Sequence, residues 1–242
     1  MGEAEARVTL ADTANLHTFV EAFRFIGNNF DFLLTKAGQQ LELSGAAVGI
    51  ALVISLPLGV VLGHLHRGSG LAIGASIVGR ALPSLVLIAA FLTLLGIGFV
   101  NNMVALAVLA TGPILTNSFD AVDRVDPDAV DAARGMGMTG TQILRNIELP
   151  LALPLLFTGL RIAAVTVVAT APIAAIAGGG GLGDVIVNQA SYRLAGVLGA
   201  SICVMILSAA VFLGLLGLQA AVTPAGVRRH TSEEVTLERS ST

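Results

Sequence analysis

Residues 125–154 read VDPDAVDAARGMGMTGTQILRNIELPLALP, a polar stretch with long apolar runs on both sides. An aspartate on either side of Pro127 can accept a hydrogen bond from the free N–H groups that begin a helix, and proline itself suits the first helical turn. Gly135 and Gly137 can adopt the left-handed conformation in which many helices end. The first half of this stretch is therefore predicted to form one short helix.

A second helix is predicted to follow, with Thr139 or Thr141 as its capping residue. Pro150 and Pro154 then mark the return to an apolar run. The result is a predicted helix–turn–helix whose first helix carries a ridge of small side chains. These side chains are Ala129, Ala132 and Ala133. Another protein can approach such a ridge closely.

The rest of the chain is strongly apolar. Apolar residues make up 55% of it, charged residues 12%, and its mean hydropathy is +0.85. A soluble domain carries about twice that charged fraction. The apolar runs are continuous, and several reach the length of about 20 residues that a helix needs to cross a bilayer. The sequence therefore predicts an all-α, polytopic membrane protein with about five transmembrane helices. The predicted spans are 44–63, 81–100, 103–119, 155–177 and 194–222.

The segments around these spans complete the predicted domain organisation. Residues 1–43 mix aromatic and charged side chains, and we expect them to form an external segment at the membrane surface that does not span. Residues 44–222 form the transmembrane domain, with its polar loop at 120–150 and a further helix at 71–80. Residues 223–242 are polar and charged, which predicts a disordered tail.

Basic residues predict the orientation of the chain, because they gather in the cytoplasmic connections of membrane proteins. Here they gather on one set of connections. That set contains Arg67, Arg80, Arg124, Arg134, Arg145, Arg228 and Arg229. We therefore expect the 120–150 loop and the C-terminus in the cytoplasm and the N-terminus outside. The glycine run at 178–181 is then an external, flexible turn, and Asp184 is expected to cap the next helix.

Few residues could support catalysis or hold a cofactor. The one cysteine, Cys203, and the four histidines show no metal-ligand spacing. The only lysine, Lys36, is followed by Ala37, so the Gly-Lys-Ser/Thr sequence of a phosphate-binding loop does not occur. There is no basic patch and no tryptophan, which argues against nucleic-acid binding. We predict a chain with no enzymatic active site and no cofactor of its own.

The polar stretch resembles the EAA motif of binding-protein-dependent ABC importer permeases. That motif is Glu-Ala-Ala, three residues, Gly, nine residues and Ile-x-Leu-Pro. The matching residues are Asp131, Ala132, Ala133, Gly137, Ile147, Leu149 and Pro150. The one departure is aspartate for glutamate at position 131, which keeps the charge. The resemblance extends over residues 40–222.

This resemblance implies a type I ABC importer permease fold, in which the loop forms a coupling helix that docks on an ATPase. It implies cytoplasmic ATPase subunits that bind ATP and Mg, a second permease subunit that is identical or homologous, and an external substrate-binding protein. It also implies a multi-pass location in a bacterial cell membrane, in contact with lipid. A standalone channel or secondary transporter is the alternative from another class.

Two further stretches resemble permeases that import quaternary amines such as glycine betaine, choline, carnitine or proline betaine. They are RALPSLVLIAAFLTLLGIG at 80–98 and GLRIAAVTVVATAPIAAIAGGGGLGDVI at 159–186. D-methionine permeases share the five-span layout and the GGLGD ending, so a D-methionine-type importer is the alternative. The Pro83-Ser84-Leu85 step and the LLGIG run favour the quaternary-amine branch.

Five residues are candidates for the translocation pathway or its gate. They are Pro83, Ser84, Pro113, Asn117 and Pro172. The three prolines are predicted to interrupt spans, and interrupted helices can line a pathway at membrane depth. Prolines are also common in membrane helices generally, which leaves both interpretations open. Asn117 can contribute to an inner gate or simply lie at the membrane interface.

Overall fold

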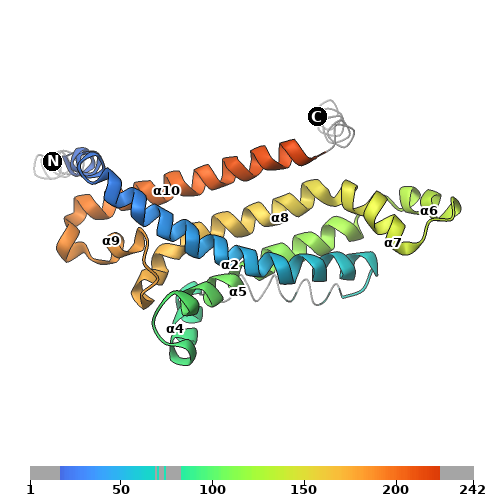
Figure 1. Ribbon diagram of the computed structural model, residues 1–242, viewed down its shortest axis with the longest axis horizontal. Coiled ribbons are helices and arrows are strands. Elements are labelled where there is room, and N and C mark those ends of the chain that lie inside the picture. Colours follow the sequence, from blue (N-terminus) through green and yellow to red (C-terminus); the bar gives the residue numbers. More distant parts are fainter. Residues whose placement is uncertain (1–16, 69, 71–73, 75–82, 224–242) are drawn as a thin grey trace, which may run out of the picture. The chain divides into compact units, whose positions relative to one another are not determined.

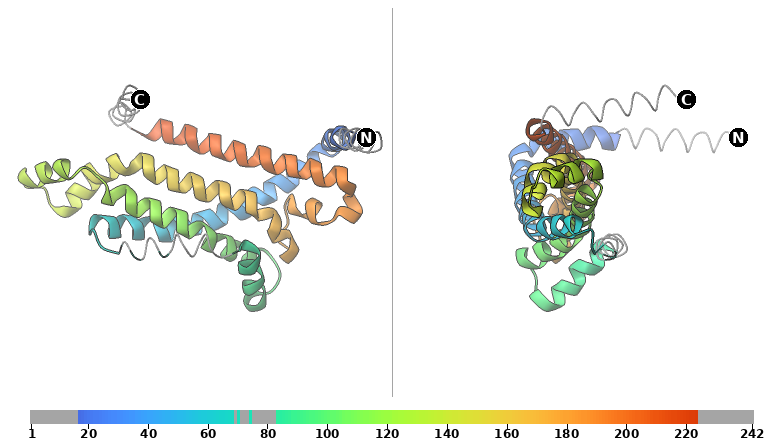
Figure 2. Two further views of the ribbon diagram at one scale, coloured as in Figure 1. Left: turned by 180° about the vertical axis from the view of Figure 1, so that it is seen from behind. Right: turned by 90° about the vertical axis from the view of Figure 1, so that its right-hand side faces the viewer.

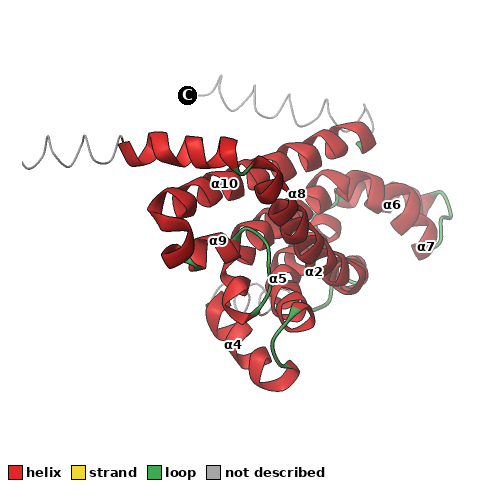
Figure 3. Cartoon of the chain, turned by 60° about the vertical axis from the view of Figure 1, so that its left-hand side comes forward, coloured by secondary structure: helices red, strands yellow, loops and turns green. Residues whose placement is uncertain are grey.

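The structure, a computed structural model, describes residues 17–68, 70, 74 and 83–223. Within these ranges every regular element is a helix and none is a strand, as Figure 3 shows. The all-α prediction is therefore confirmed. The expected helix at 71–80 and the expected tail at 223–242 lie outside the described residues, apart from Gly74 and Thr223.

Figure 1 labels the helices along the chain. Residues 17–28 are helical and precede α2. The remaining elements are α2 (Phe30–His64), α4 (Ser84–Leu95), α5 (Phe99–Asp123), α6 (Pro127–Gly135), α7 (Gly140–Ile143), the π-helical turn η1 (Leu144–Glu148), α8 (Leu149–Thr170), the 3-10 helix η2 (Ala171–Ala177), α9 (Gly183–Val187) and α10 (Gln189–Val222).

Four helical stretches of the described chain are long and apolar enough to cross a membrane. They are Phe30–His64, Phe99–Asp123, Gly140–Ala177 and Gln189–Val222. The prediction of a single span at 81–100 is wrong, because α4 contains 12 residues and a crossing needs about 20. The predicted number of spans is therefore close to the observed number, but one of them is a shorter apolar helix.

Proline and glycine residues set the limits of α4. Pro83 has an extended backbone, with φ −60° and ψ 129°, and α4 begins at the next residue. Gly96 and Gly98 follow α4 with φ values of +76° and +135°, a conformation that glycine adopts at no steric cost. Asn102 then ties the start of α5 to η2, because its Nδ2 donates to the carbonyl oxygens of Gly98 at 2.8 Å and Ala177 at 3.1 Å.

Helix α2 begins earlier than the sequence predicts. It runs without a break from Phe30 to His64 and crosses the expected boundary, where Leu43 and Ser44 are buried. The expectation that residues 1–43 do not span rests on their charged side chains, and Lys36 is one of them. In the structure Lys36 has an acidic partner, so a longer apolar helix can carry it.

That partner is Asp184, whose Oδ2 lies 2.6 Å from Lys36 Nζ. The ammonium group also lies 5.9 Å from the ring centroid of Phe32, which stacks on Tyr192. The prediction that Asp184 caps α9 is wrong, because Asp184 lies inside the helix and Leu182 occupies the capping position. The carboxylate instead fastens α9 to α2.

The described residues fall into two compact units. The first contains 17–48, 83–107 and 165–210, and the second contains 49–68, 70, 74, 108–164 and 211–223. Helices α2, α5, α8 and α10 each supply one segment to each unit, and the colours of Figure 2 allow each helix to be followed from two sides. The two units are described separately below.

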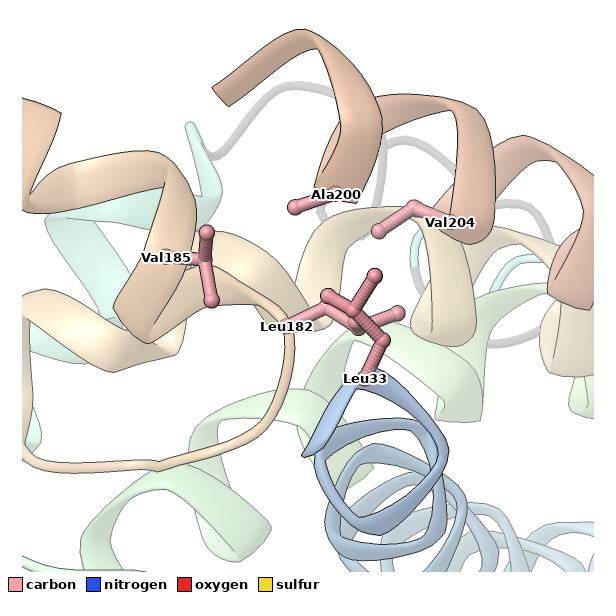
Figure 4. Packing of buried hydrophobic residues seen from close by; sticks show 5 residues of the cluster. All are labelled: Leu33, Leu182, Val185, Ala200 and Val204. Atoms are coloured by element: carbon pink, nitrogen blue, oxygen red, sulfur yellow. The ribbon is translucent and has the colours of Figure 1, made fainter. Parts of the chain in front are cut away.

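The core of the first unit gathers residues from α2, α10 and the start of α9. Figure 4 shows its buried side chains lying together. They are Leu33, Leu182, Val185, Ala200 and Val204. Because two of these residues come from the α9 region, the core holds that short helix against the two long ones.

The glycine run at 178–181 forms a packed turn in the first unit. Gly178, Gly180 and Gly181 have φ values between +72° and +76°, where other residues are strained. Gln40 of α2 holds the end of the turn, since its Oε1 accepts a hydrogen bond from the N–H of Leu182 at 3.3 Å. The turn thus follows from glycine's conformational freedom and from a buried amide on a distant helix.

In the second unit, glycines allow α5 to lie close to both α2 and α8. A Cβ on Gly59 would lie 2.6 Å from the Cβ of Ser118, and one on Gly63 would lie 2.7 Å from a backbone carbonyl oxygen of α5. A Cβ on Gly159 of α8 would lie 2.5 Å from the Cβ of Asn117. Small residues four apart on a membrane helix permit this kind of approach.

Replacing Gly59 by leucine is expected to force α2 away from α5 and to destabilise the second unit by about 2 kcal/mol. The new side chain would meet the Leu115 carbonyl oxygen, 2.8 Å from the added Cβ, and backbone cannot rotate aside. Thermal denaturation of the detergent-purified protein measures the effect. Gly49→Leu is the matched control in the same helix, because a Cβ there meets nothing within 4 Å. Equal denaturation temperatures for the two variants would contradict the close contact.

Candidate functional site

The first helix of the 120–150 loop, α6, begins where the sequence predicts. Asp126, and not Asp128, is its N-cap: Asp126 Oδ1 accepts a hydrogen bond from the N–H of Asp128 at 2.9 Å. Pro127 occupies the first position of the helix. An aspartate at this end is favourable because the N-terminus of a helix carries a partial positive charge.

Helix α6 ends at Gly135, and Gly137 completes the turn that follows. Gly137 has a φ of +82°, and its N–H donates to the carbonyl oxygen of Arg134 at 2.9 Å. The N–H of Met138 donates to the carbonyl oxygen of Ala133 at 3.2 Å. Such bonds satisfy carbonyl groups that a helix end leaves without partners. The prediction that this glycine ends the helix is confirmed.

The second helix, α7, begins after Thr139. Gln142 Oε1 accepts a hydrogen bond from the N–H of Thr139 at 2.8 Å, one half of a capping box. The chain then continues as helix through η1 and into α8 without a gap. We refer to α6, α7 and the turn between them as the hairpin (Figure 1).

Pro150 and Pro154 lie in the first turns of α8, at the start of the apolar run that they were predicted to mark, and the helix continues through both. The π-helical turn explains how the helix continues. The N–H of Leu149 donates to the carbonyl oxygen of Leu144, five residues back, and the next residue is Pro150, which has no N–H to donate. The wider turn directly precedes the missing hydrogen bond.

A small apolar core holds the hairpin together. Val130, Ala133 and Ile143 are buried in it, and Ile147 packs against them. Two residues of the predicted motif, Ala133 and Ile147, therefore face inward. A third, Leu149, packs against a separate cluster that joins the start of α8 to α2 and α5. That cluster contains Val60, Ala121, Val122, Ala152 and Leu156.

The opposite face of α6 and the turn after it are exposed. Asp131 and Ala132 lie on this face, and Arg134 Nη1 donates to Asp131 Oδ1 at 3.2 Å. Met136 is 74% exposed. A methionine in this position can adapt its shape to a partner surface. The sequence prediction missed Met136, although an apolar residue between two glycines at a helix end was a signal for it.

A buried carboxylate lies at the other end of the segment, and the sequence prediction missed it too. Glu148 fills the unspecified position of the Ile-x-Leu-Pro pattern, and 4% of its side chain is exposed. Its Oε2 lies 2.6 Å from Nδ1 of His64, the last residue of α2. A buried carboxylate is costly unless it is paired, so His64 belongs to this site. An acidic residue inside an apolar motif was the available signal.

The five candidate pathway residues fall in both units. Pro83 and Ser84 lie at the start of α4 and Pro172 lies in η2, all in the first unit. Pro113 and Asn117 lie in α5 within the second unit, where Asn117 Nδ2 donates to the carbonyl oxygen of Pro113 at 2.8 Å. Pro83 and Pro172 do mark helix ends, whereas α5 continues through Pro113.

The exposed face of the hairpin suits contact with another protein. It combines small side chains, one exposed methionine and a charged pair on a short, well-capped helix. In the described ranges, no group of three or more His, Cys, Asp or Glu side chains could hold a metal ion.

Residues 24–225 match the family described as binding-protein-dependent transport system inner membrane component. The chain belongs to this family. This permease-family chain is 35% identical over 205 residues to the glycine betaine/carnitine/choline transport system permease protein of Bacillus subtilis (strain 168), with 84% of this chain and 94% of the relative covered. It is 34% identical over 215 residues to the osmoprotectant import permease protein of Salmonella typhimurium, with 86% and 100% covered.

Solved structures agree with the fold of this inner membrane component. A chain of the MetNI methionine ABC transporter in an inward-facing conformation matches it with a TM-score of 0.69 and 23% identity, over 79% of this chain and 96% of the other. At that identity the likeness concerns the fold. The predicted importer-permease fold is confirmed.

Proposed function

We propose that this chain is the permease subunit of an ATP-driven importer of quaternary-amine osmoprotectants, and that its hairpin receives a separate ATPase. The observation that carries the proposal is the fold of the motif. Ala133 and Ile147 hold the hairpin from inside, which leaves Asp131, Ala132 and Gly137 exposed for a partner. Family membership supports transport that depends on a binding protein.

In this proposal, two permease subunits face each other across the pathway, as the same chain twice or as a pair of homologues. The hairpin and the C-terminus lie in the cytoplasm, and the N-terminus lies outside. ATP and Mg bind to the ATPase, whose closure draws the hairpins together and switches the pathway from inward-facing to outward-facing. Pro83, Ser84, Pro113, Asn117 and Pro172 remain our candidates for the pathway and its gate.

The names of the relatives support the substrate class. They include permeases for glycine betaine, carnitine and choline and one for osmoprotectants, and their identity to this chain extends over most of its length. An external binding protein would deliver the substrate. An aromatic cage in that protein suits a quaternary ammonium group.

Reconstitution tests the function directly. The chain is purified with its ATPase and binding protein and placed in proteoliposomes that contain ATP. Uptake of labelled glycine betaine, choline or carnitine is expected, and it should require ATP. Uptake of D-methionine without any of the amines would make the chain a methionine-type importer. Uptake in the absence of the ATPase would identify a standalone channel or secondary transporter.

Cysteine cross-linking tests the docking surface and the orientation together. In a Cys203→Ser background, Ala132→Cys is expected to cross-link to a cysteine in the surface groove of the ATPase. Ser191→Cys, which is also exposed but lies after α9 on the proposed external side, is the control and should give no such product. The reverse pattern would overturn the proposed orientation. Immunoblotting of the cross-linked complex is the measurement.

A further inference from the structure

The contact between His64 and Glu148 has no role in the function as described so far. Among the pairs of a carboxylate with a histidine or arginine in the described part of the second unit, it is the least exposed, with side chains 23% and 4% exposed. In each of the other pairs one partner is more than half exposed. These pairs are His66–Asp123, Arg124–Asp120 and Arg134–Asp131. Exposed pairs contribute little, whereas removing one partner of a buried pair leaves the other polar group without its hydrogen bond.

The imidazole of His64 reaches both ends of the segment between the hairpin turn and α8. Its Nδ1 lies 2.6 Å from Glu148 Oε2, at the end of η1. Its Nε2 lies on the side of Gly140, the first residue of α7. A Cβ added to Gly140 would be 3.4 Å from this nitrogen. One side chain of α2 therefore lies beside the beginning of α7 and contacts the end of η1.

The base of His64 is anchored by close helix contacts. The preceding residue, Gly63, lies against α5, where an added Cβ would be 2.7 Å from the carbonyl oxygen of Phe119 and 3.0 Å from the Cβ of Val122. Backbone packed this closely transmits a displacement rather than absorbing it. A push on α7 or η1 would thus pass through His64 to α2 and α5.

The segment beside His64, from α7 to the end of η1, includes a π-helical turn. The π-helical turn η1 links the hairpin to α8, and such turns occur frequently at functional sites. Glu148 is its last residue. Its carboxylate therefore belongs to the junction between the hairpin and α8.

We propose that the His64–Glu148 pair is the link through which movement of the docked hairpin reaches α2. The inference rests on the proposed function, since it assumes an ATPase on the hairpin. In this role His64 and Glu148 are positioning residues, which act through the helices that they join. Breaking the pair is expected to leave the ATPase bound but to lower the number of substrate molecules imported for each ATP hydrolysed.

The test uses the reconstituted complex of permease, ATPase and binding protein. Uptake of labelled glycine betaine and release of inorganic phosphate are measured in the same proteoliposomes. In His64→Ala the ratio of uptake to hydrolysis is expected to fall by at least about fivefold, the lower end of typical coupling factors between sites. In Glu148→Gln a smaller fall of the same ratio is expected. The ATPase should still co-purify.

His66→Ala is the matched control. His66 lies two residues further along and also pairs with a carboxylate, that of Asp123 at 2.8 Å, but its side chain is 58% exposed. In His66→Ala the ratio of uptake to ATP hydrolysis is expected to stay within about twofold of that of the unmodified complex, because an exposed pair is screened by solvent. The double variant His64→Gln/Glu148→Gln restores a neutral hydrogen-bonding pair and should recover part of the lost ratio.

Each outcome decides the inference. Full coupling in His64→Ala and Glu148→Gln overturns it, and so does a parallel loss of uptake and hydrolysis. If neither variant assembles with the ATPase, the pair serves to build the complex and the inference is also overturned. If the unmodified complex shows no ATP-dependent uptake, the proposed function itself fails. That last result is distinguishable because it appears before any substitution is made.

Discussion

Replacing Ala133 by aspartate is expected to abolish ATP-driven uptake while the chain still inserts into the membrane. Ala133 is 1% exposed and lies in the small core with Val130 and Ile143. An aspartate there would place a carboxylate among apolar side chains without a partner. We expect a cost of about 3 kcal/mol, in the upper range for single substitutions. Val125, Met138 and Ile147 pack against this same core, so its disruption should separate the two helices.

Uptake in proteoliposomes and limited proteolysis of the hairpin measure this effect. Ala132→Asp is the matched control, because the neighbouring side chain is exposed and the same chemical change there leaves the core intact. Its hairpin should resist proteolysis like the unmodified protein, while binding of the ATPase weakens. If Ala133→Asp resists proteolysis and imports substrate normally, the core does not hold the docking surface in place.

Replacing Gly183 by valine is expected to prevent α9 from packing in the first unit. An added Cβ would overlap the carbonyl oxygen of Pro172 and would lie 2.8 Å from both Pro172 Cα and Ala175 Cβ. Two of these three atoms belong to the backbone of η2, so no rotation of a side chain relieves the contact. Overpacking of this kind costs about 1–3 kcal/mol of stability. Because valine is β-branched, we expect a cost at the upper end of this range.

The loss should extend beyond α9, because Leu182 and Val185 on either side of Gly183 belong to the core with Leu33. A lower yield of monodisperse protein and a lower denaturation temperature are expected. Gly45→Val is the control in the same unit, since a Cβ at Gly45 meets nothing within 4 Å. If Gly183→Val is as stable as Gly45→Val, then α9 and η2 are not held at this distance.

The local features of this chain could be predicted from the sequence because each depends on a few neighbouring residues. Helix α6 begins at Pro127 and its terminal turn depends on Gly137, as capping chemistry predicts. Apolar run length likewise predicted the class of fold and nearly all the spans. The motif from Asp131 to Pro150 predicted the family. All these signals are contiguous in sequence, so no tertiary structure was needed to see them.

The tertiary structure decided which charges the apolar helices can carry. Lys36 is one of the charged residues for which we expect residues 1–43 not to span, and only the structure shows that its partner is Asp184, 148 residues away. Glu148 occupies the unspecified position of the Ile-x-Leu-Pro pattern, so the sequence gives it no role. The structure places it beside His64, which is 84 residues earlier in the chain. A charge is acceptable in a buried or apolar setting when an opposite group meets it. That meeting depends on how distant helices pack, which local sequence patterns do not encode.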